Sequence, residues 1–182
     1  GMGDSTKKLI SLPGPLTLSY LPYAKNLQAQ TALARQAGHE LMVHMPMQPE
    51  GTENPGPDVL TGKMSEIELK KALNTALDTF DGYAGINNHM GSKLTTDAQA
   101  MRWVMDVLKQ RGVFFVDSKT IGSSVGAQIA AQSGIPFAER DVFLDHDTDI
   151  GAVRASLRKL ENIAWAEGVA IAKVLQLDQG AG

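Results

Sequence analysis

The chain contains no cysteine, which excludes disulfide bonds, thiolate zinc sites and a cysteine nucleophile. Any metal ion would therefore bind through histidine, aspartate, glutamate or water. Long apolar runs are absent too, since no stretch approaches the roughly 20 apolar residues of a membrane-spanning helix. The start, Gly1-Met2-Gly3-Asp4, lacks the basic and then apolar pattern of a signal peptide. Gly1-Met2 is typical of an expression remnant, which fits an export signal removed from the chain.

The sequence also lacks a strong charge of either sign. It has 17 Lys and Arg against 20 Asp and Glu, a formal net charge of −3, and no basic run that could follow a phosphate backbone. We therefore expect no nucleic-acid partner. With 182 residues, of which 43% are hydrophobic, the chain can bury one core, and we expect a single domain over residues 1–182. These numbers leave the oligomeric state open.

The chain does have a regular alternation of short apolar runs and longer helical stretches, with glycine or proline at many joints. The predicted strands are 16–21, 39–44, 84–87, 113–117, 141–144 and 169–172. The predicted helices are 27–36, 66–79, 97–110, 123–132 and 150–166. Several strands are apolar on consecutive residues, as strands buried on both faces are. The order predicts an α/β fold with a mostly parallel sheet.

Local signals refine this prediction. Two helices begin with a predicted capping box, formed by Ser65 with Glu68 and by Thr96 with Gln99. The segment 45–63 has four prolines, three glycines and no apolar period, which indicates a functional or disordered loop.

Two helical tryptophans, Trp103 and Trp165, could stack on a sugar. At helical positions a place in or near the core is expected instead. The last predicted helix carries an apolar stripe that we expect to be used in packing, formed by Ile150, Val153, Leu157, Leu160 and Ala164.

Polar residues lie where three predicted strands end. His44 closes the strand 39–44, His89 follows the strand 84–87, and Asp117 closes the strand 113–117. Because ligands bind at the carboxyl ends of parallel strands, we expect these side chains to share one rim. Two imidazoles and a carboxylate form a common divalent-metal triad with an open position for water. Either histidine could instead be a hydrogen-bonded structural residue.

The other polar residues at this rim also allow more than one interpretation each. Asp117 could be the third metal ligand, act as an acid or base, orient a histidine, or cap the turn that follows it. Asn87 and Asn88 could clamp a substrate hydroxyl or carbonyl, or bond their own backbone in a turn. Asp145 and His146 could join the rim from another strand, or belong to a solvated loop with local ion pairs.

Together these residues lie in stretches that resemble the divergent polysaccharide deacetylases. The matching stretches are Leu12-Pro13-Gly14-Pro15-Leu16-Thr17-Leu18, Gly38-His39-Glu40-Leu41, His44-Met45-Pro46-Met47, Asn87-Asn88-His89-Met90-Gly91-Ser92, Phe114-Phe115-Val116-Asp117-Ser118 and Arg140-Asp141-Val142-Phe143-Leu144-Asp145. They run in order across nearly the whole chain, and the combination is specific although each stretch alone is weak.

The resemblance implies a distorted or incomplete (β/α) barrel of the polysaccharide deacetylase type. In this family a divalent metal, expected to be zinc, activates water to remove an acetyl group from an N-acetylated sugar. By the resemblance, His44 and His89 occupy metal-site positions and Asp117 is a catalytic acidic residue at the rim. The residues that we expect to bind substrate are Asn87, Asn88, Ser92 and Asp145.

The sequence departs from the family pattern at two places. The family usually opens with an apolar strand that ends in a metal-binding Asp-Asp pair, whereas this chain begins at Gly1-Met2-Gly3. Later, the strand 169–172 should lead into a Gly-His-Pro motif, but Lys173-Val174-Leu175 follows it. Because a barrel without its opening strand would leave exposed edges, we expect at least part of these segments to be omitted rather than lost.

The leading hypothesis is therefore a metal-dependent hydrolase that deacetylates an N-acetylated polysaccharide or cell-envelope glycan, located in the periplasm or otherwise outside the cytoplasm. The alternative is a catalytically inactive carbohydrate-binding or envelope interaction protein on the same fold. A third possibility is a metal-dependent hydrolase that acts on an ester or a peptide amide. Zinc binding and substrate assays would distinguish them.

Overall fold

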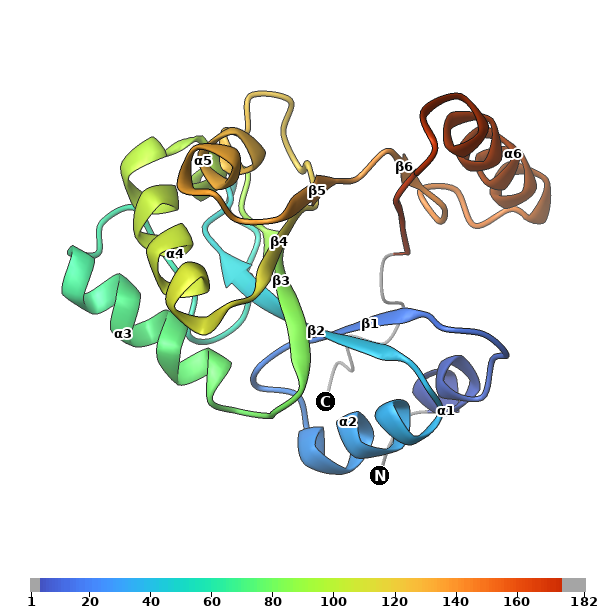
Figure 1. Ribbon diagram of the computed structural model, residues 1–182, viewed down its shortest axis with the longest axis horizontal. Coiled ribbons are helices and arrows are strands. Elements are labelled where there is room, and N and C mark those ends of the chain that lie inside the picture. Colours follow the sequence, from blue (N-terminus) through green and yellow to red (C-terminus); the bar gives the residue numbers. More distant parts are fainter. Residues whose placement is uncertain (1–3, 175–182) are drawn as a thin grey trace. The chain divides into compact units, whose positions relative to one another are not determined.

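A computed structural model describes residues 4–174 of the chain (Figure 1). The chain divides into two compact units, residues 1–137 and 138–182. The single domain expected over residues 1–182 stays a prediction. Gly1 to Gly3 and Leu175, where two family motifs were expected, lie outside the described residues. The elements of the first unit are α1 (Asp4–Ile10), β1 (Thr17–Tyr20), α2 (Leu27–Gln36), β2 (Glu40–Met47), α3 (Glu66–Leu77), β3 (Tyr83–Met90), η1 (Leu94–Thr96), α4 (Ala98–Arg111), β4 (Phe114–Asp117) and α5 (Gly126–Ser133).

The strands form a five-stranded sheet in the order β1-β2-β3-β4-β5, where β5 (Phe137–Glu139) lies at the boundary of the first unit. The pairs β1–β2, β2–β3 and β3–β4 are parallel. Parallel neighbours need a long crossover, and the helices α2, α3 and α4 each lie in one of these connections. The predicted α/β class with a mostly parallel sheet is confirmed.

Side chains along β2 alternate between two faces of the sheet, as in any strand. Val43, Met45 and Met47 are fully buried and join one core cluster with residues from α3 and α4. Figure 1 shows α3, α4 and α5 on one side of β3 and β4. The alternate residue His44 lies on the opposite face from these methionines and is only partly buried. The pleat therefore directs Val43, Met45 and Met47 to the helices and His44 to the other face, where the apolar Met42 is its neighbour in alternation.

One predicted capping box is confirmed and the other is wrong. Ser65 caps α3 by accepting from the Glu68 N–H, while the Glu68 carboxylate accepts from the Ser65 N–H at 2.8 Å. The cap of α4 is Asp97 rather than Thr96, because Asp97 Oδ1 accepts from the N–H groups of Gln99 and Ala100, each at 3.0 Å. A carboxylate one position later offers these N–H groups a charged acceptor at the positive end of the helix dipole.

The second unit contains β6 (Val142–Phe143), α6 (Ile150–Glu167) and β7 (Ala172–Lys173), and its two strands pair in parallel. The helix predicted at 150–166 is confirmed. No residue of α6, all of which are described, is buried. Trp165 is 89% exposed, so its predicted place in or near the core is wrong, whereas Trp103 packs against the core of the first unit.

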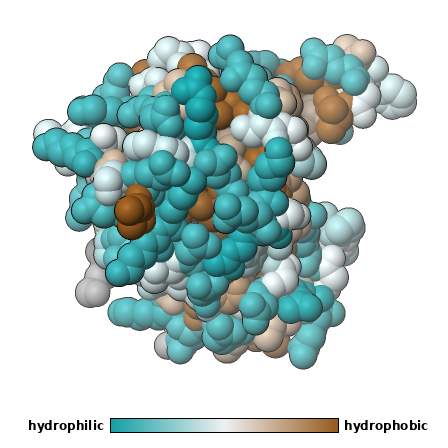
Figure 2. Space-filling view, turned by 60° about the vertical axis from the view of Figure 1, so that its left-hand side comes forward, coloured by the Kyte–Doolittle hydropathy of each residue, from teal (hydrophilic) through white to brown (hydrophobic). Residues whose placement is uncertain are grey.

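The face of the first unit that carries α3 and α4 is largely hydrophilic, as Figure 2 shows. Exposed large apolar residues include Ile67, which is 81% exposed on α3. Across residues 4–174, no helix combines the length and apolar character needed to cross a membrane.

Candidate functional site

Two histidines from neighbouring strands lie in direct contact. The register of β2 and β3 pairs His44 with Asn87 and Pro46 with His89. Paired residues of parallel strands share a face, so His44, Asn87 and His89 project from the same side of the sheet. Nδ1 of His89 lies 3.1 Å from Nε2 of His44, and the ring centroids are 4.8 Å apart at an interplanar angle of 66°. The structure thus brings together the two histidines predicted to bind metal.

Asn87 fixes the hydrogen positions on His44. Its Oδ1 can only accept, so His44 Nδ1 donates to it at 2.9 Å. A neutral His44 then has its lone pair on Nε2, the atom that faces His89. In metal sites a ligating histidine usually donates its other ring N–H to an oxygen in this way, which sets the tautomer and the orientation of the ring. Asn87, which is only 6% exposed, can provide that accepting oxygen for His44.

The spacing of the two imidazoles suits a shared cation. Two zinc–nitrogen bonds of about 2.05 Å at a tetrahedral angle place the two nitrogens about 3.3 Å apart. The separation of His44 Nε2 and His89 Nδ1 is 3.1 Å, so a shift of a few tenths of an ångström would admit a zinc ion between them. The donor chemistry and the geometry of the two histidines fit two positions of a zinc ligand set.

A complete ligand set is not present in the part of the chain that the structure describes. Within residues 4–174 no group of three or more His, Cys, Asp or Glu side chains is arranged to hold a metal ion. The two histidines therefore account for part of a metal site.

Asp117 lies on the other face of the sheet. The register pairs Val116 with Asn87, so the next residue, Asp117, points to the side covered by helices. It is fully buried, and its Oδ1 accepts from the Lys119 N–H at 2.7 Å while its Oδ2 accepts from the Ser124 hydroxyl at 2.5 Å. These bonds give Asp117 the turn-capping role that was one of the roles considered from the sequence. Its catalytic role stays a prediction.

Asn88 is a structural link between two strand ends. Its side chain is fully buried, with Nδ2 donating to the Met90 carbonyl and Oδ1 accepting from the Ser118 N–H, both at 2.7 Å. The Ser118 hydroxyl donates back to the Asn88 carbonyl at 2.7 Å. Of the two adjacent asparagines, Asn87 contacts His44, whereas Asn88 joins the end of β3 to the end of β4.

The remaining predicted substrate-binding residues lie in two different surroundings. Ser92 accepts from the Glu50 N–H at 2.9 Å, which ties the loop after β2 to the loop after β3. Asp145 belongs to the second unit. There, burial and then the charge of Arg140 lower the pKa of Lys173 to about 8, and the negative charge of Asp145 acts in the opposite direction. The substrate contacts expected of Asn87, Asn88, Ser92 and Asp145 stay predictions.

Two partners of the site residues were not foreseen from the sequence. Asn87 was considered only as a substrate clamp or a turn residue, and Ser124 was not considered at all. Asn87 is the partner of His44, and Ser124 is the partner of Asp117. A partner on a distant segment can be identified only when the way the segments pair is known. The order Asn87-Asn88-His89 could have predicted that Asn87 and His89 share a face, because residues two positions apart in a strand point to the same side.

Comparisons with known proteins agree with this fold. The sequence profile described as "Divergent polysaccharide deacetylase" matches residues 1–175. A crystal structure of the uncharacterized protein ATU2773 from Agrobacterium tumefaciens C58 superimposes with a TM-score of 0.90 and 29% identity, covering 96% of this chain and 72% of that chain.

Two curated bacterial proteins are similar in sequence. An uncharacterized protein of Haemophilus influenzae is 32% identical over 164 residues, and the uncharacterized protein YibQ of Escherichia coli K12 is 29% identical over 165 residues. The matches cover 90% and 91% of this chain, but only 59% and 52% of those relatives. The chain therefore spans a little over half the length of the curated relatives that it matches.

Proposed function

Because this chain belongs to the divergent polysaccharide deacetylase family, we propose that it is a metal-dependent hydrolase that removes acetyl groups from an N-acetylated polysaccharide of the cell envelope. One observation carries the metal dependence: His44 Nε2 and His89 Nδ1 converge to 3.1 Å, with His44 oriented by Asn87. The activity of the whole protein is part of the proposal, since the chain spans 59% and 52% of its curated relatives.

In the proposed mechanism, His44 and His89 hold a divalent metal, for which zinc is the best match to two imidazole ligands. A bound zinc ion would polarise the acetyl carbonyl and make water a better nucleophile near neutral pH. Asn87 keeps His44 in the tautomer that leaves Nε2 available to the metal. Further ligands would come from water or from protein groups outside the described residues.

The segments next to the histidines would contribute rigidity. Asn88 and Ser118 join the ends of β3 and β4 through two hydrogen bonds of 2.7 Å, and a third of the same length ties the Asn88 side chain to the Met90 carbonyl within β3. Asp117 orders the turn that leads toward α5 through Lys119 and Ser124. Rigid strand ends matter here because a displacement of about 1 Å in a catalytic site can reduce the rate on the order of a hundredfold.

A second candidate function is supported by a specific observation. Because no third metal-binding side chain joins His44 and His89 within residues 4–174, the domain could bind an envelope glycan without turning it over. A related hydrolase that acts on esters or peptide amides is the third candidate. For either of the enzymes we propose a periplasmic or other extracytoplasmic location, where the envelope glycan is found.

Zinc titration by calorimetry tests the proposal. We expect the native protein to bind one zinc ion per chain, and His44→Ala and His89→Ala each to weaken binding at least about a hundredfold, as expected when one of two protein ligands is lost. His146→Ala is the matched control, because His146 is exposed in the second unit. Absence of zinc binding, or binding that does not require the two histidines, would remove the metal-dependent hydrolase.

Acetate release from N-acetylated chito-oligosaccharides, measured beside acetyl ester and peptide substrates, separates the candidates. Release from the sugar amide that requires both His44 and His89 supports the deacetylase. Zinc binding with no release from any substrate favours the glycan-binding protein. Selective release from the ester or the peptide identifies the third candidate.

A further inference from the structure

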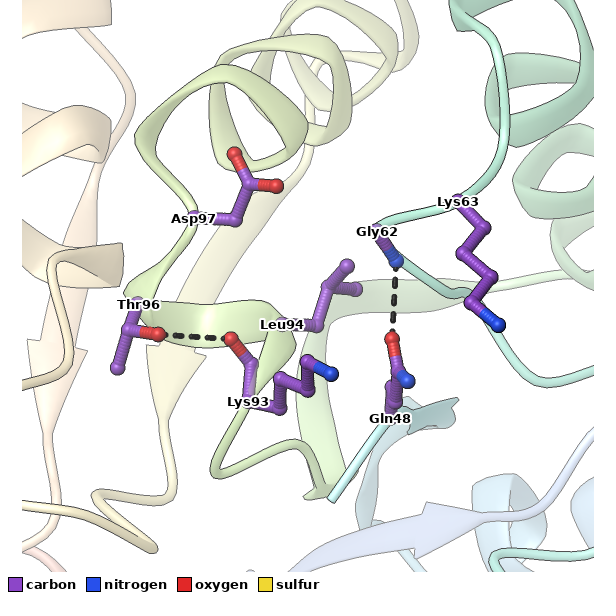
Figure 3. A pocket seen from close by; sticks show the side chains of 7 residues that line it. All are labelled: Gln48, Gly62, Lys63, Lys93, Leu94, Thr96 and Asp97. Carbon is purple, nitrogen blue, oxygen red and sulfur yellow. Dashed lines mark hydrogen bonds between the residues drawn. The ribbon is translucent and has the colours of Figure 1, made fainter. Parts of the chain in front are cut away.

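A second site lies beyond the carboxyl ends of β2 and β3, in a part of the first unit that the histidines do not use. It is an open pocket of about 410 Å³, within the size range of small-molecule sites. Figure 3 shows the residues around it, which come from the loop after β2 and from the segment that joins β3 to α4. The residues that line it are Gln48, Gly62, Lys63, Lys93, Leu94, Thr96 and Asp97.

Gln48 holds the walls of the pocket together. Its backbone carbonyl accepts from the N–H groups of Lys93 and Leu94, at 3.0 and 3.1 Å, and its own N–H donates to the Leu60 carbonyl at 2.9 Å. Its side-chain Oε1 accepts from the Gly62 N–H at 3.0 Å, the bond drawn in Figure 3. Because Oε1 is held by this bond, the amide orientation of Gln48 is fixed, and Nε2 is left as a donor beside the pocket.

Two lysines add positive charge. Lys63 and Lys93 are both exposed, and neither forms an ion pair or a side-chain hydrogen bond with any residue in 4–174. In contrast, Lys70 on α3 is paired with both Glu66 and Asp106, at 2.6 and 2.9 Å. The pocket is therefore lined by two lysines and one carboxylate, that of Asp97, and neither lysine forms an ion pair with it.

One acceptor lies opposite these donors. Asp97 uses Oδ1 for the N–H groups of Gln99 and Ala100 at the start of α4. Its Oδ2 would lie 3.3 Å from a Cβ added at Gly62, so the space in front of this oxygen is open because residue 62 has no side chain. The pocket thus offers ammonium and amide donors together with one carboxylate oxygen that can accept from a hydroxyl.

We propose that this pocket is a subsite for an acidic sugar unit, whose oxyanion contacts Lys63, Lys93 and the Gln48 amide, and whose hydroxyl donates to Asp97 Oδ2. The proposal rests on the proposed function, in that the ligand is a glycan, and it adds that the glycan carries anionic groups. A carboxylate and a phosphate share this chemistry. The test therefore separates the two.

The test is binding measured by NMR titration with D-glucuronate, glucose 6-phosphate and neutral glucose. We expect one or both of the anionic sugars to bind at least tenfold more tightly than glucose, and 0.5 M NaCl to weaken that binding. Lys63→Gln and Lys93→Gln should each weaken it about tenfold, as loss of a charge-assisted hydrogen bond does. Lys25→Gln, at an exposed lysine outside the pocket, should leave it unchanged.

A steric variant tests the same site without a change in charge. Gly62→Ala puts a methyl group 3.3 Å from Asp97 Oδ2 and 3.9 Å from Gln48 Oε1, and it should also weaken the anionic sugar about tenfold. Preference for glucuronate identifies a carboxylated glycan, and preference for glucose 6-phosphate a phosphorylated one. Equal affinity for all three sugars, or binding unaffected by the two lysine variants, overturns the proposal.

The outcome is separable from that of the hydrolase proposal. The double variant Lys63→Gln, Lys93→Gln should bind zinc as the native protein does, and His44→Ala should bind the anionic sugar as the native protein does. Loss of zinc binding in the double variant would place both effects in one site and would contradict a separate subsite.

Discussion

Replacement of Asn88 by alanine should lower the free energy of unfolding by about 2 to 4 kcal/mol and leave zinc affinity within about threefold of the native value. Asn88 is fully buried, and its side chain makes two hydrogen bonds of 2.7 Å. Truncation leaves the buried Ser118 N–H without that acceptor, which costs about 1 to 3 kcal/mol. The Met90 carbonyl keeps the Thr120 hydroxyl at 3.1 Å, so the second loss is smaller.

Urea unfolding followed by circular dichroism measures this change in free energy, and thermal unfolding gives an independent value. For a chain of this size, about 2 to 4 kcal/mol corresponds to a fall in Tm of about 4 to 16 °C. Zinc affinity is measured by calorimetry on the same samples. The two assays together separate a structural role from a role at the histidines.

The neighbouring asparagine is the matched control. Asn87→Ala removes the single hydrogen bond to His44 Nδ1, so it should cost only about 0.5 to 1.5 kcal/mol. It should weaken zinc binding about 10- to 100-fold, because the tautomer of His44 is no longer fixed. The reasoning fails if Asn88→Ala costs less than about 1 kcal/mol, or if the two variants change stability and zinc affinity in the same proportion.

Three further variants test other parts of the fold by chemical unfolding. Gly91→Ala should destabilise the protein by about 1 to 3 kcal/mol, because Gly91 has φ +93° and an added Cβ would lie 2.9 Å from Met47 Cβ; a neutral result would contradict the strain. His39→Ala should lower the free energy of unfolding by about 2 kcal/mol without any change in zinc affinity. The reason is that the His39 ring accepts from the Leu16 N–H at 3.2 Å and bonds the Ile10 carbonyl at 2.9 Å. Altered zinc binding in this variant would refute the structural role. Burial lowers the pKa of Lys173 from 10.5 to about 8, so between those pH values the unfolded chain binds more protons than the folded one. The free energy of unfolding should therefore rise from pH 8 to pH 10.5. Lys173→Met should remove that rise, and a rise that persists in the variant would assign it to another group.

The sequence predicted the order and type of most elements because apolar periodicity is a local property. The helix predicted at 27–36 coincides with α2, and the predicted strand 39–44 overlaps β2 over residues 40–44. Strand ends were less accurate. β2 runs on to Met47 into the segment expected to be a loop, because Met45 and Met47 are fully buried against helices far along the chain.

Elements with weak local signals were missed. The short α1, η1 and β5 were not predicted, since each has few residues and no repeating apolar pattern. The strand predicted at 169–172 lies mostly before the observed β7, which begins at Ala172. A two-residue strand is defined by its partner rather than by its own sequence, and β7 exists through its pairing with β6.

For the candidate site, the sequence identified which residues come together at strand ends but not the direction of each side chain. His44 and His89 were expected at one rim, and their rings are in contact. Asp117 was expected at that rim too, yet it faces the helices, because the register pairs Val116 rather than Asp117 with Asn87. One residue of register reverses every side chain of a strand, and register is set by contacts between distant segments.

The contact between the two imidazoles has a consequence for metal uptake. With 3.1 Å between His44 Nε2 and His89 Nδ1, there is space for a single bridging hydrogen and not for two opposed ones. A cation held between these two atoms needs a lone pair on each, so a neutral His89 would carry its hydrogen on Nε2 instead. Loading of the pair would then require a change of tautomer at His89, which ¹⁵N NMR of the imidazole nitrogens before and after zinc addition would report.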